Sequence, residues 1–311
     1  MNIASIDIGT NTVLLYIAHV NHELHTLKTI CNRYEIPRLG KGLAQSGLIS
    51  DEKRNALINV LKNYRIEIEK ENCEIVLAHS TYPLRTAQNA QQVIEDVFKE
   101  TGIRISVIDG ETEARFSFLG ATSGGGNGNP CVIDIGGGST ELSIGNNNTI
   151  SYRKSIPIGA VNLTEQFFKS FPPTKPAFRE LVNFVSTTLR ENYSIKQKIS
   201  VGIAIAGTPT TLACMKLGLT DFDEEKINSC TLSSFEMNMF INELSLLTPK
   251  EILGKFSTVV KGREDVLLTG TLILTKIMEF LELETITISS HGLRHGAVID
   301  YLFTTSGKYF V

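Results

Sequence analysis

Two stretches of the chain share one pattern: an apolar strand that ends in Asp-x-Gly and is followed by small polar residues. The first is SIDIGTNTVLLYI at residues 5–17, and the second is VIDIGGGSTELSIG at residues 132–145. Their aspartates, Asp7 and Asp134, are 127 positions apart (134 − 7 = 127). Glycine has no Cβ, so backbone N–H groups in such a turn can approach an anion closely. The repeat therefore predicts two phosphate-binding loops, each of which opens one half of the chain.

The groups expected to bind phosphate are backbone amides and short polar side chains of the two loops: Gly9, Thr10, Asn11 and Thr12 in the first, and Gly136, Gly137, Gly138, Ser139 and Thr140 in the second. Carboxylates do not attract phosphate, so Asp7 and Asp134 make sense there as ligands of Mg²⁺ or of its water shell. The alternative is a pair of hairpin turns in which each Asp accepts turn hydrogen bonds. The duplication favours the phosphate role.

A candidate for water activation is Glu113, within GETEARFSFLGATS, which follows the predicted strand ISVID. This segment predicts a helix with Glu113 in its first turn, where the helix dipole favours an ionised carboxylate by about 0.3–1 kcal/mol. An ionised carboxylate is suited to orienting or deprotonating a water molecule. The structural alternative is a solvated Glu113 that pairs with Arg115.

Two further segments offer groups that could bind an anion. Arg85, in STYPLRTAQNA, is expected at the start of a helix, where a guanidinium and helix N–H groups together bind phosphate well. AGTPTTLA places Gly207 and Thr208 at a strand-to-helix turn, which is either a further anion cradle or a tight structural turn. The alternative for Arg85 is a structural role at the edge of the site.

The elements that must position these residues alternate between strand and helix. Hairpin strands are expected over 3–9 and 12–20, a third strand from Leu24 to about Ile30, and a helix capped by Ser50 and Asp51. Further expected elements are the strands EIVLAHS and ISVID, one helix over PLRTAQNAQQVIEDVFKETG, a return strand in TISYRKSIPIG, a helix near 176–192, the strand VGIAIAG, the helix TPTTLACMKLG, helices over roughly 233–283, and a last strand and helix in TITISSHGLRHGAVIDYLF. This order indicates an α/β layer fold.

The glycine-rich segment SGGGNGNP at residues 123–130 is the predicted linker. The pattern of elements restarts after it, which indicates an internal duplication with a ligand cleft between the halves. The predicted domains are residues 1–119 together with 295–311, and residues 120–294.

Composition narrows the function classes. The chain has 311 residues, of which 42% are hydrophobic and 20% charged, and its formal net charge is −3. This charge argues against nucleic-acid binding, and no apolar run reaches the roughly 18–20 residues of a membrane span. The five scattered cysteines include no CxxC pair and indicate buried thiols in a reducing cytoplasm.

Beyond these physical arguments, the chain resembles the exopolyphosphatase / guanosine pentaphosphate phosphohydrolase family, within the actin, sugar-kinase and heat-shock-ATPase superfamily. The stretches that carry the resemblance are DIGTNTVLLYI, RLGKGL, AHSTYPLRTAQNA, GETEARFSFLG, VIDIGGGSTELSIG, IPIGAVNLTEQF, AGTPTTLA, GREDVLLTGTLIL and GLRHGAV. They occur in the family's order over nearly the whole chain. The resemblance implies two duplicated actin-like (ribonuclease H-like) domains with an interdomain cleft.

The resemblance also implies an activity: Mg²⁺-dependent hydrolysis of terminal phosphoanhydride bonds in inorganic polyphosphate, guanosine pentaphosphate or both, the second being a nucleotide of the stringent response. It makes Glu113 the catalytic residue, puts Arg85 and Asn89 on the substrate side, and assigns Glu141 with Asp134 to the metal. Strand alternation places Glu141 on the face opposite its neighbours, so it need not enter the core. The family often has a second acid where Thr112 stands here.

Two other functions remain open at this stage. One is a small-molecule kinase of the same superfamily, and the other is a non-catalytic sensor of nucleotides or polyphosphate. The sequence does not rank the two substrates, and it leaves the oligomeric state open, a homodimer included.

Overall fold

The computed structural model describes residues 1–123, 128–146, 149–197 and 199–307. Half of the predicted linker, residues 124–127, lies outside this range. The chain divides into two compact units. Unit 1 comprises Met1–Gly125 and His291–Val311, and unit 2 comprises Gly126–Ser290.

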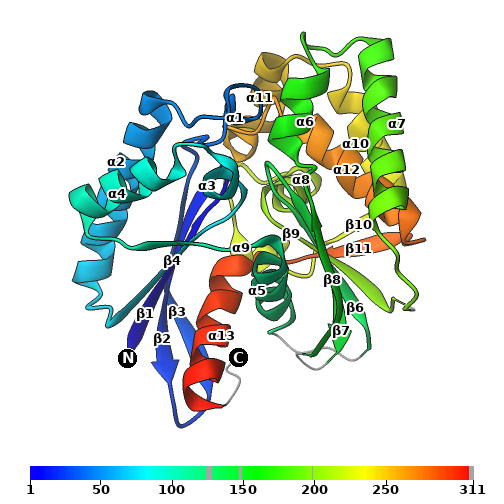
Figure 1. The fold of residues 1–311 in the computed structure, drawn as a ribbon. Helices are drawn as coiled ribbons and strands as arrows, with labels where there is room; N and C mark the ends of the chain where they lie inside the picture. The colour runs from blue at the N-terminus through cyan, green and yellow to red at the C-terminus, as the bar shows by residue number, and fades with distance from the viewer. Residues whose placement is uncertain (124–127, 147–148, 198, 308–311) are drawn as a thin grey trace. The chain divides into compact units, whose positions relative to one another are not determined.

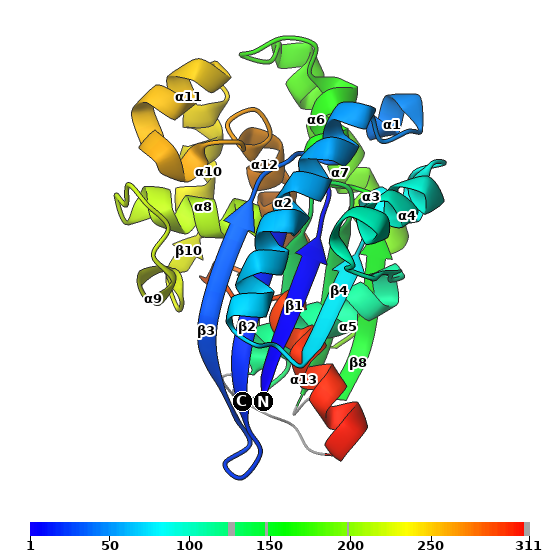
Figure 2. The ribbon, with the colours of Figure 1, turned by 90° about the vertical axis from the view of Figure 1, so that its left-hand side faces the viewer.

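The described part of unit 1 is built on a mixed five-stranded sheet with the order β3-β2-β1-β4-β5 (Figures 1 and 2). Strands β1 to β3 are antiparallel neighbours, whereas β4 and β5 run parallel to β1 because helices connect them. The strands are β1 (Asn2–Ile8), β2 (Val13–Asn21), β3 (Thr26–Glu35), β4 (Ile75–Ser80) and β5 (Ile105–Val107).

Helices cover both faces of this sheet. Leu57 and Leu61 of α2 pack with Ile6 on one face, whereas Val298 and Leu302 of α13 belong to the cluster on the other. Figure 1 shows α13 beside α5, and Figure 2 shows α2 lying over the strands. The helices of unit 1 are α1 (Leu43–Ser46), α2 (Asp51–Lys70), α3 (Tyr82–Thr86), α4 (Ala90–Thr101), α5 (Gly110–Thr122) and α13 (Leu293–Ser306).

The described part of unit 2 is built on a six-stranded sheet with the order β10-β11-β9-β6-β7-β8. Its strands are β6 (Pro130–Ile135), β7 (Thr140–Asn146), β8 (Thr149–Ile156), β9 (Val201–Ile205), β10 (Thr231–Ser233) and β11 (Thr285–Ile288). Its helices are α6 (Ala160–Phe167), α7 (Lys175–Asn192), α8 (Gly207–Lys216), α9 (Glu224–Ile227), α10 (Ser234–Leu244), α11 (Pro249–Phe256), the 3₁₀ helix η1 (Ser257–Val260) and α12 (Leu267–Phe280). The buried side chains of α7, α8 and α12 form one core with those of β6 and β7.

The two sheets repeat one topology. Read from β8, the second sheet runs β8-β7-β6-β9-β11, and its first three strands are antiparallel neighbours while the next two are parallel. The first sheet, read from β3, has the same sequence of directions. The described part of unit 2 differs by the short antiparallel strand β10 at its edge. The predicted α/β class and internal duplication are therefore confirmed.

Two local predictions need correction, and two elements were missed. The third strand begins at Thr26 and reaches Glu35, because residues 22–25 form the turn and His25 adopts a positive φ of 52°. The single helix predicted over residues 83–102 is two helices, α3 and α4. The extended backbone of Ala87 (ψ 131°) separates them, and Gly102 ends the second as expected. Helix α6 and strand β10 were not predicted.

Candidate functional site

The turn after β1 is held in a fixed shape. The N–H of Gly9 donates to the carbonyl of Thr12 at 3.0 Å, and a Cβ on Gly9 would lie 3.2 Å from the same oxygen. Ser80 ties the end of β1 to β4, since its Oγ donates to the carbonyl of Ile8 at 3.0 Å. The Asp7 loop therefore belongs to the rigid edge of the sheet.

The segment RLGKGL, residues 38–43, forms hydrogen bonds with this turn. The N–H of Gly40 donates to the carbonyl of Thr10 at 2.8 Å, and that of Arg38 donates to the carbonyl of Asn11 at 3.0 Å. A Cβ on Gly40 would lie 2.4 Å from Cγ2 of Thr10, so only glycine permits this approach. The carbonyl oxygens of Thr10 and Asn11 therefore accept hydrogen bonds from this segment.

The turn after β6 repeats this geometry. The N–H of Gly136 donates to the carbonyl of Ser139 at 3.0 Å, and a Cβ on Gly136 would lie 3.1 Å from that oxygen. Since 9 + 127 = 136 and 12 + 127 = 139, these are the same two positions of the repeat. The duplication therefore extends to the hydrogen bond that closes each loop.

The start of α6 binds the carbonyl side of the second loop. The N–H of Ala160 donates to the carbonyl of Gly136 at 3.0 Å, and the N–H of Val161 donates to that of Gly137 at 2.8 Å. A Cβ on Gly159 would lie 2.4 Å from backbone atoms of the loop, so this contact also requires glycine. Within the described residues, the N–H groups of Gly137, Gly138 and Ser139 donate no hydrogen bond. Gly138 and Ser139 are buried and Gly137 is partly buried, so these amides can donate to a ligand, and a phosphate oxygen would supply an acceptor.

Asp134 and Glu141 are direct partners across β6 and β7, so their side chains lie on the same face of the sheet. Glu141 pairs in register with Ser155 of β8, whose Oγ donates to Glu141 Oε1 at 2.6 Å. Glu141 is only 1% exposed, and Thr140 and Leu142 beside it are also buried. Strand alternation was right about its face, but both faces of β7 are covered, so Glu141 does enter the interior.

Tyr193, which follows the last residue of α7, supports the same strand. Its hydroxyl donates to the carbonyl of Thr140 at 3.0 Å. Burial, and after it the negative charge of Glu141, raises the pKa of Tyr193 well above its ordinary value. The hydroxyl therefore keeps its proton and remains a donor.

In unit 1 the polar neighbour of Asp7 is His79, which the sequence analysis did not single out. The two residues are partners across the parallel strands β1 and β4. The His79 ring packs edge-on against Phe116 of α5 at 5.3 Å between ring centroids. Burial lowers the pKa of His79, and the Asp300 carboxylate opposes this shift only in part. No local sequence signal joins His79 to Asp7, because the two residues become neighbours only through the parallel pairing of β4 with β1.

Glu113 lies in the first turn of α5, as predicted. Asp109 caps this helix by accepting a hydrogen bond from the N–H of Thr112 at 2.7 Å. Glu113 is 6% exposed, and Arg115, its expected solvent-side partner, instead donates from Nε to Asp300 of α13 at 2.8 Å. The alternative of a solvated Glu113 is therefore wrong.

Arg85 is the observed ionic partner of Glu113. Its Nη1 lies 3.0 Å from Glu113 Oε2 and also donates to the carbonyl of Ile108 at 2.9 Å. Arg85 lies in the last turn of the five-residue helix α3, so its expected place at a helix start is corrected. Asn89, expected on the substrate side, instead exchanges hydrogen bonds with the backbone of Ile49 at 2.8 and 3.0 Å.

The turn before α8 combines an unusual backbone with a nearby cation. Ala206 has a positive φ of 76°, which a residue with a Cβ rarely adopts. A Cβ on Gly207 would lie 2.5 Å from Nε of Arg263, a residue without an expected role. Thr208 is buried, and its Oγ1 would be 2.2 Å from a Cβ on Gly270 of α12. The close packing around Gly207 and Thr208 therefore explains these two residue types without any bound ligand.

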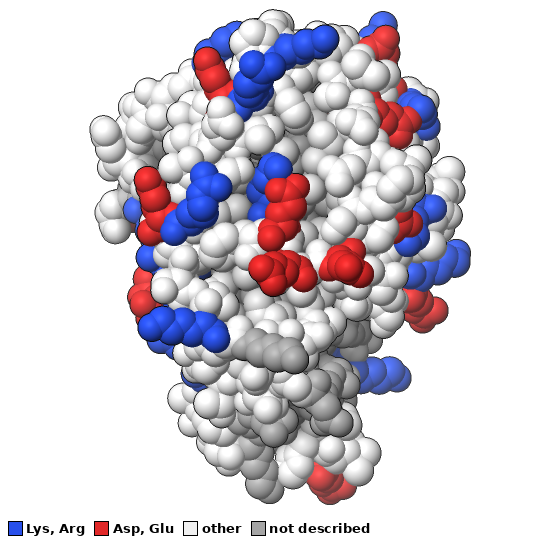
Figure 3. All heavy atoms as spheres, turned by 90° about the vertical axis from the view of Figure 1, so that its right-hand side faces the viewer, with Lys and Arg blue, Asp and Glu red and all other residues white. Residues whose placement is uncertain are grey.

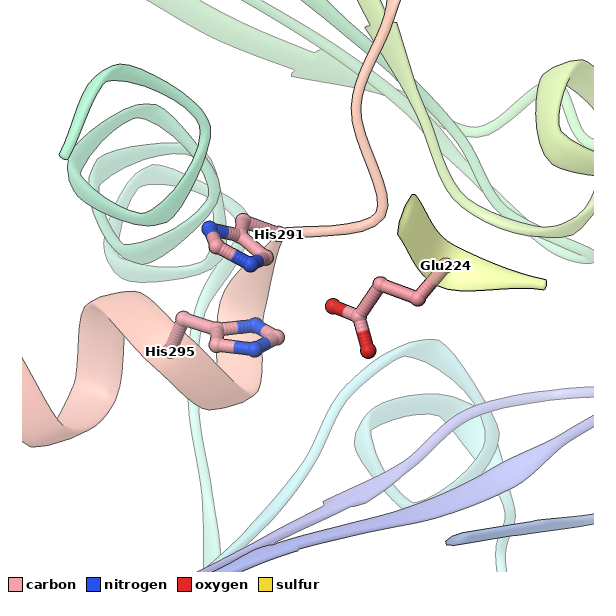
Figure 4. Close-up of side chains that lie close together, drawn as sticks. All are labelled: Glu224, His291 and His295. Carbon is pink, nitrogen blue, oxygen red and sulfur yellow. The ribbon is translucent and has the colours of Figure 1, made fainter. Parts of the chain in front are cut away.

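Two histidines stack at the start of α13, where Figure 4 shows them side by side. The rings of His291 and His295 are 4.2 Å apart and inclined by 27°. The N–H of Gly292 lies 3.4 Å from His295 Nδ1, which makes Nδ1 the acceptor and leaves the ring proton on Nε2. Glu224, also labelled there, accepts a hydrogen bond from Ser290 Oγ at 2.7 Å within unit 2.

The structure thus joins the candidate residues in pairs inside each unit. Arg85 forms an ion pair with Glu113, Asp7 lies beside His79, and Asp134 lies beside Glu141.

No described helix is long and apolar enough to cross a membrane. On the face shown in Figure 3, basic and acidic side chains are interspersed without an extended patch of one sign.

Comparison with known proteins gives a consistent result. The model of the Ppx/GppA phosphatase family matches residues 17–305. A bifunctional 3-dehydroquinate synthase/phosphatase of Fusobacterium nucleatum is 32% identical over 308 residues, covering 96% of this chain and 46% of that protein. A guanosine-5'-triphosphate,3'-diphosphate pyrophosphatase of Vibrio atlanticus is 29% identical over 96% of this chain and 58% of its own. The chain thus spans about half the length of these two relatives.

Exopolyphosphatase 1 of Mycobacterium tuberculosis is 25% identical, with 97% of this chain and 88% of that protein covered. Among solved structures, the Aquifex aeolicus member of the Ppx/GppA family has a TM-score of 0.82 at 32% identity, covering 98% of this chain and 99% of its own. An exopolyphosphatase of Cytophaga hutchinsonii has a TM-score of 0.86 at 26% identity over the full length of both chains. The expected actin-like two-domain fold is confirmed by these similarities.

Proposed function

Because the chain belongs to the Ppx/GppA phosphatase family, we propose that it hydrolyses terminal phosphoanhydride bonds and releases orthophosphate. The proposed substrates are inorganic polyphosphate, guanosine pentaphosphate or both, in line with the names of the relatives. The observation that carries the proposal is the buried, ion-paired Glu113 at the start of α5, in a protein with two closed glycine loops.

Hydrolysis of a phosphoanhydride needs an oriented water and stabilised charge on the phosphoryl oxygens, and little covalent help from the protein. In the proposal Glu113 accepts a hydrogen bond from the attacking water and takes its proton. The amides of Gly137, Gly138 and Ser139 donate to phosphate oxygens, and the Gly9–Thr12 turn does the same in unit 1. Gly207 and Thr208 complete the proposed phosphate-binding set, whereas Arg85 is ion-paired with Glu113.

The residues proposed to hold Mg²⁺ fit a hard cation, because Asp134 and Glu141 present two carboxylates on one face of adjacent strands. Glu141 is buried, and a bound Mg²⁺ would offset the cost of burying its negative charge. Asp7 holds the equivalent position to Asp134 in unit 1. When bound, Mg²⁺ would neutralise negative charge on the phosphoryl oxygens. Ser155 orients Glu141, and Tyr193 keeps β7 in place.

The kinase and the sensor are less well supported. A kinase of this superfamily would be expected to use a catalytic Asp of the second domain, whereas the base proposed here is Glu113 of unit 1. A sensor needs no general base, whereas the proposed hydrolysis uses Glu113 as one. A reducing cytoplasm is part of the proposal, since all five cysteines are free.

The test is Mg²⁺-dependent phosphate release from both substrates by wild type and Glu113→Gln. Loss of the base is expected to lower kcat by about 10²–10⁴-fold. Glu111→Gln is the matched control, because this exposed glutamate lies in the same first turn of α5. Phosphotransfer from ATP to an acceptor, or tight binding without turnover, would instead support the kinase or the sensor.

A further inference from the structure

We propose that Arg85 is the positioning residue of Glu113: it holds the carboxylate ionised and in one orientation, and it acts on the reaction through Glu113. The inference rests on the proposed function, and it goes beyond the phosphate contact that the family resemblance implies for Arg85.

The first argument is electrostatic. Glu113 is almost entirely buried, and burial alone favours the protonated carboxylic acid. A protonated Glu113 could not accept a proton from water. The guanidinium of Arg85 at 3.0 Å reverses this preference, because an opposite charge at hydrogen-bond distance stabilises the ionised form. The N-terminal end of α5 acts in the same direction.

The second argument is geometric. A single nitrogen of Arg85, Nη1, bridges Glu113 Oε2 and the carbonyl of Ile108. Ile108 immediately precedes Asp109, the cap of α5, and its N–H donates to the carbonyl of Ser80 at 3.0 Å. Arg85 therefore fastens the side chain of Glu113 to the turn that begins its own helix.

The third argument concerns the remaining charges near α5. The Arg115 guanidinium pairs with Asp300 of α13, and the His79 imidazole of β4 has a lowered pKa through burial. The other ionisable groups on α5, on α13 and on the sheet edge beneath them are Asp7, Asp109, Glu111, His291, Arg294, His295 and Tyr301. The Arg85 guanidinium lies 3.0 Å from the Glu113 carboxylate, so removal of Arg85 should change the titration of Glu113.

The experiment compares the pH dependence of phosphate release for wild type, Arg85→Met and Arg85→Lys. In Arg85→Met the acid limb of kcat should move upward by about one to three pH units, with KM changed less than about threefold. Arg85→Lys keeps the charge but not the planar group, so its acid limb should stay near that of wild type while kcat falls. Arg65→Met, which removes an exposed arginine paired with Glu69 on α2, is the control.

A rise in KM of tenfold or more with an unmoved acid limb would overturn the proposal and make Arg85 a phosphate ligand. A second measurement does not need turnover: the unfolding midpoints of wild type, Arg85→Met, Glu113→Gln and the double variant. Arg85→Met should lower the midpoint of wild type more than that of Glu113→Gln, because only the former keeps a buried carboxylate. Equal drops would refute the pairing, whereas an inactive wild type with unequal drops would refute only the proposed hydrolase function.

Discussion

Asp134 and Glu141 lie directly opposite each other on β6 and β7, and Ser155 extends this row of polar residues onto β8. The equivalent of Glu141 in unit 1 is Leu14, the partner of Asp7 on β2. In unit 1 the polar neighbour of the aspartate lies on the other side, at His79 of β4. The duplicated loops are therefore alike in backbone but different in chemistry, and unit 2 is the better metal ligand set.

This row predicts the behaviour of Glu141→Gln. The amide keeps the size of the side chain and can still accept from Ser155, so the free energy of unfolding should not fall markedly. Mg²⁺-dependent phosphate release should nevertheless require much more Mg²⁺. Ser155→Ala, which removes only the orienting hydrogen bond, should weaken the apparent Mg²⁺ affinity on the order of tenfold. A Mg²⁺ titration in which Glu141→Gln matches wild type would remove Glu141 from the metal site.

Gly159→Ala should disrupt the second loop. Its new methyl group would lie 2.4 Å from backbone atoms of Gly137 and Gly138, which cannot move without breaking the bonds to α6. We expect a loss of at least about 1–3 kcal/mol in urea unfolding, with reduced activity. Gly254→Ala is the control in unit 2, since open space surrounds that position within α11, and it should stabilise by roughly 0.5–1 kcal/mol. Similar results for the two variants would contradict this account of the loop.

Helices α5 and α13 approach each other through glycines, which predicts a strong effect of Gly296→Ala. A Cβ there would lie 1.7 Å from the carbonyl oxygen of Phe116, one helical turn after Glu113. The variant should lose several kcal/mol of stability, on the order of the largest single substitutions, or fail to fold. Gly102→Ala, at a left-handed position in open space, should cost only about 1–2 kcal/mol. Thermal unfolding of both variants checks the contrast.

The stability of the protein should fall as pH is lowered through the range in which unfolded histidine titrates. Burial, and then the positive charges of Arg294 and His291, lowers the pKa of His295 well below its ordinary value. The unfolded chain therefore binds a proton below about pH 6.5 while folded His295 does not, which favours unfolding. The free energy of unfolding is unaffected by His295 above that pH. Below it, the free energy of unfolding decreases by up to about 1.4 kcal/mol per pH unit. Urea unfolding at several pH values should show that the free energy of unfolding of His295→Gln depends less steeply on pH than that of wild type. An unchanged pH dependence would contradict the prediction.

Much of this organisation could be predicted from local sequence. Asp-x-Gly after an apolar strand, the capping residue Ser50, and the stop at Gly102 each depend on neighbours within a few positions; Asp51, also predicted as a cap, is the first residue of α2. Such signals specify a strand, a turn or a helix end through backbone geometry alone. For this reason the repeat at Asp7 and Asp134 and the position of Glu113 in the first turn of α5 could both be read in advance.

The ionic and polar pairs could not be read in this way, because they join residues that only the tertiary structure brings together. Arg85 and Glu113 are 28 positions apart and meet where α3 packs near the start of α5, and His79 reaches Asp7 only through parallel pairing of β4 with β1. Burial of Glu141 likewise depends on what covers both faces of β7. The sequence by itself determined which residues could do chemistry, whereas packing over long sequence separations decided their partners and their burial, and hence the charge state proposed for Glu113.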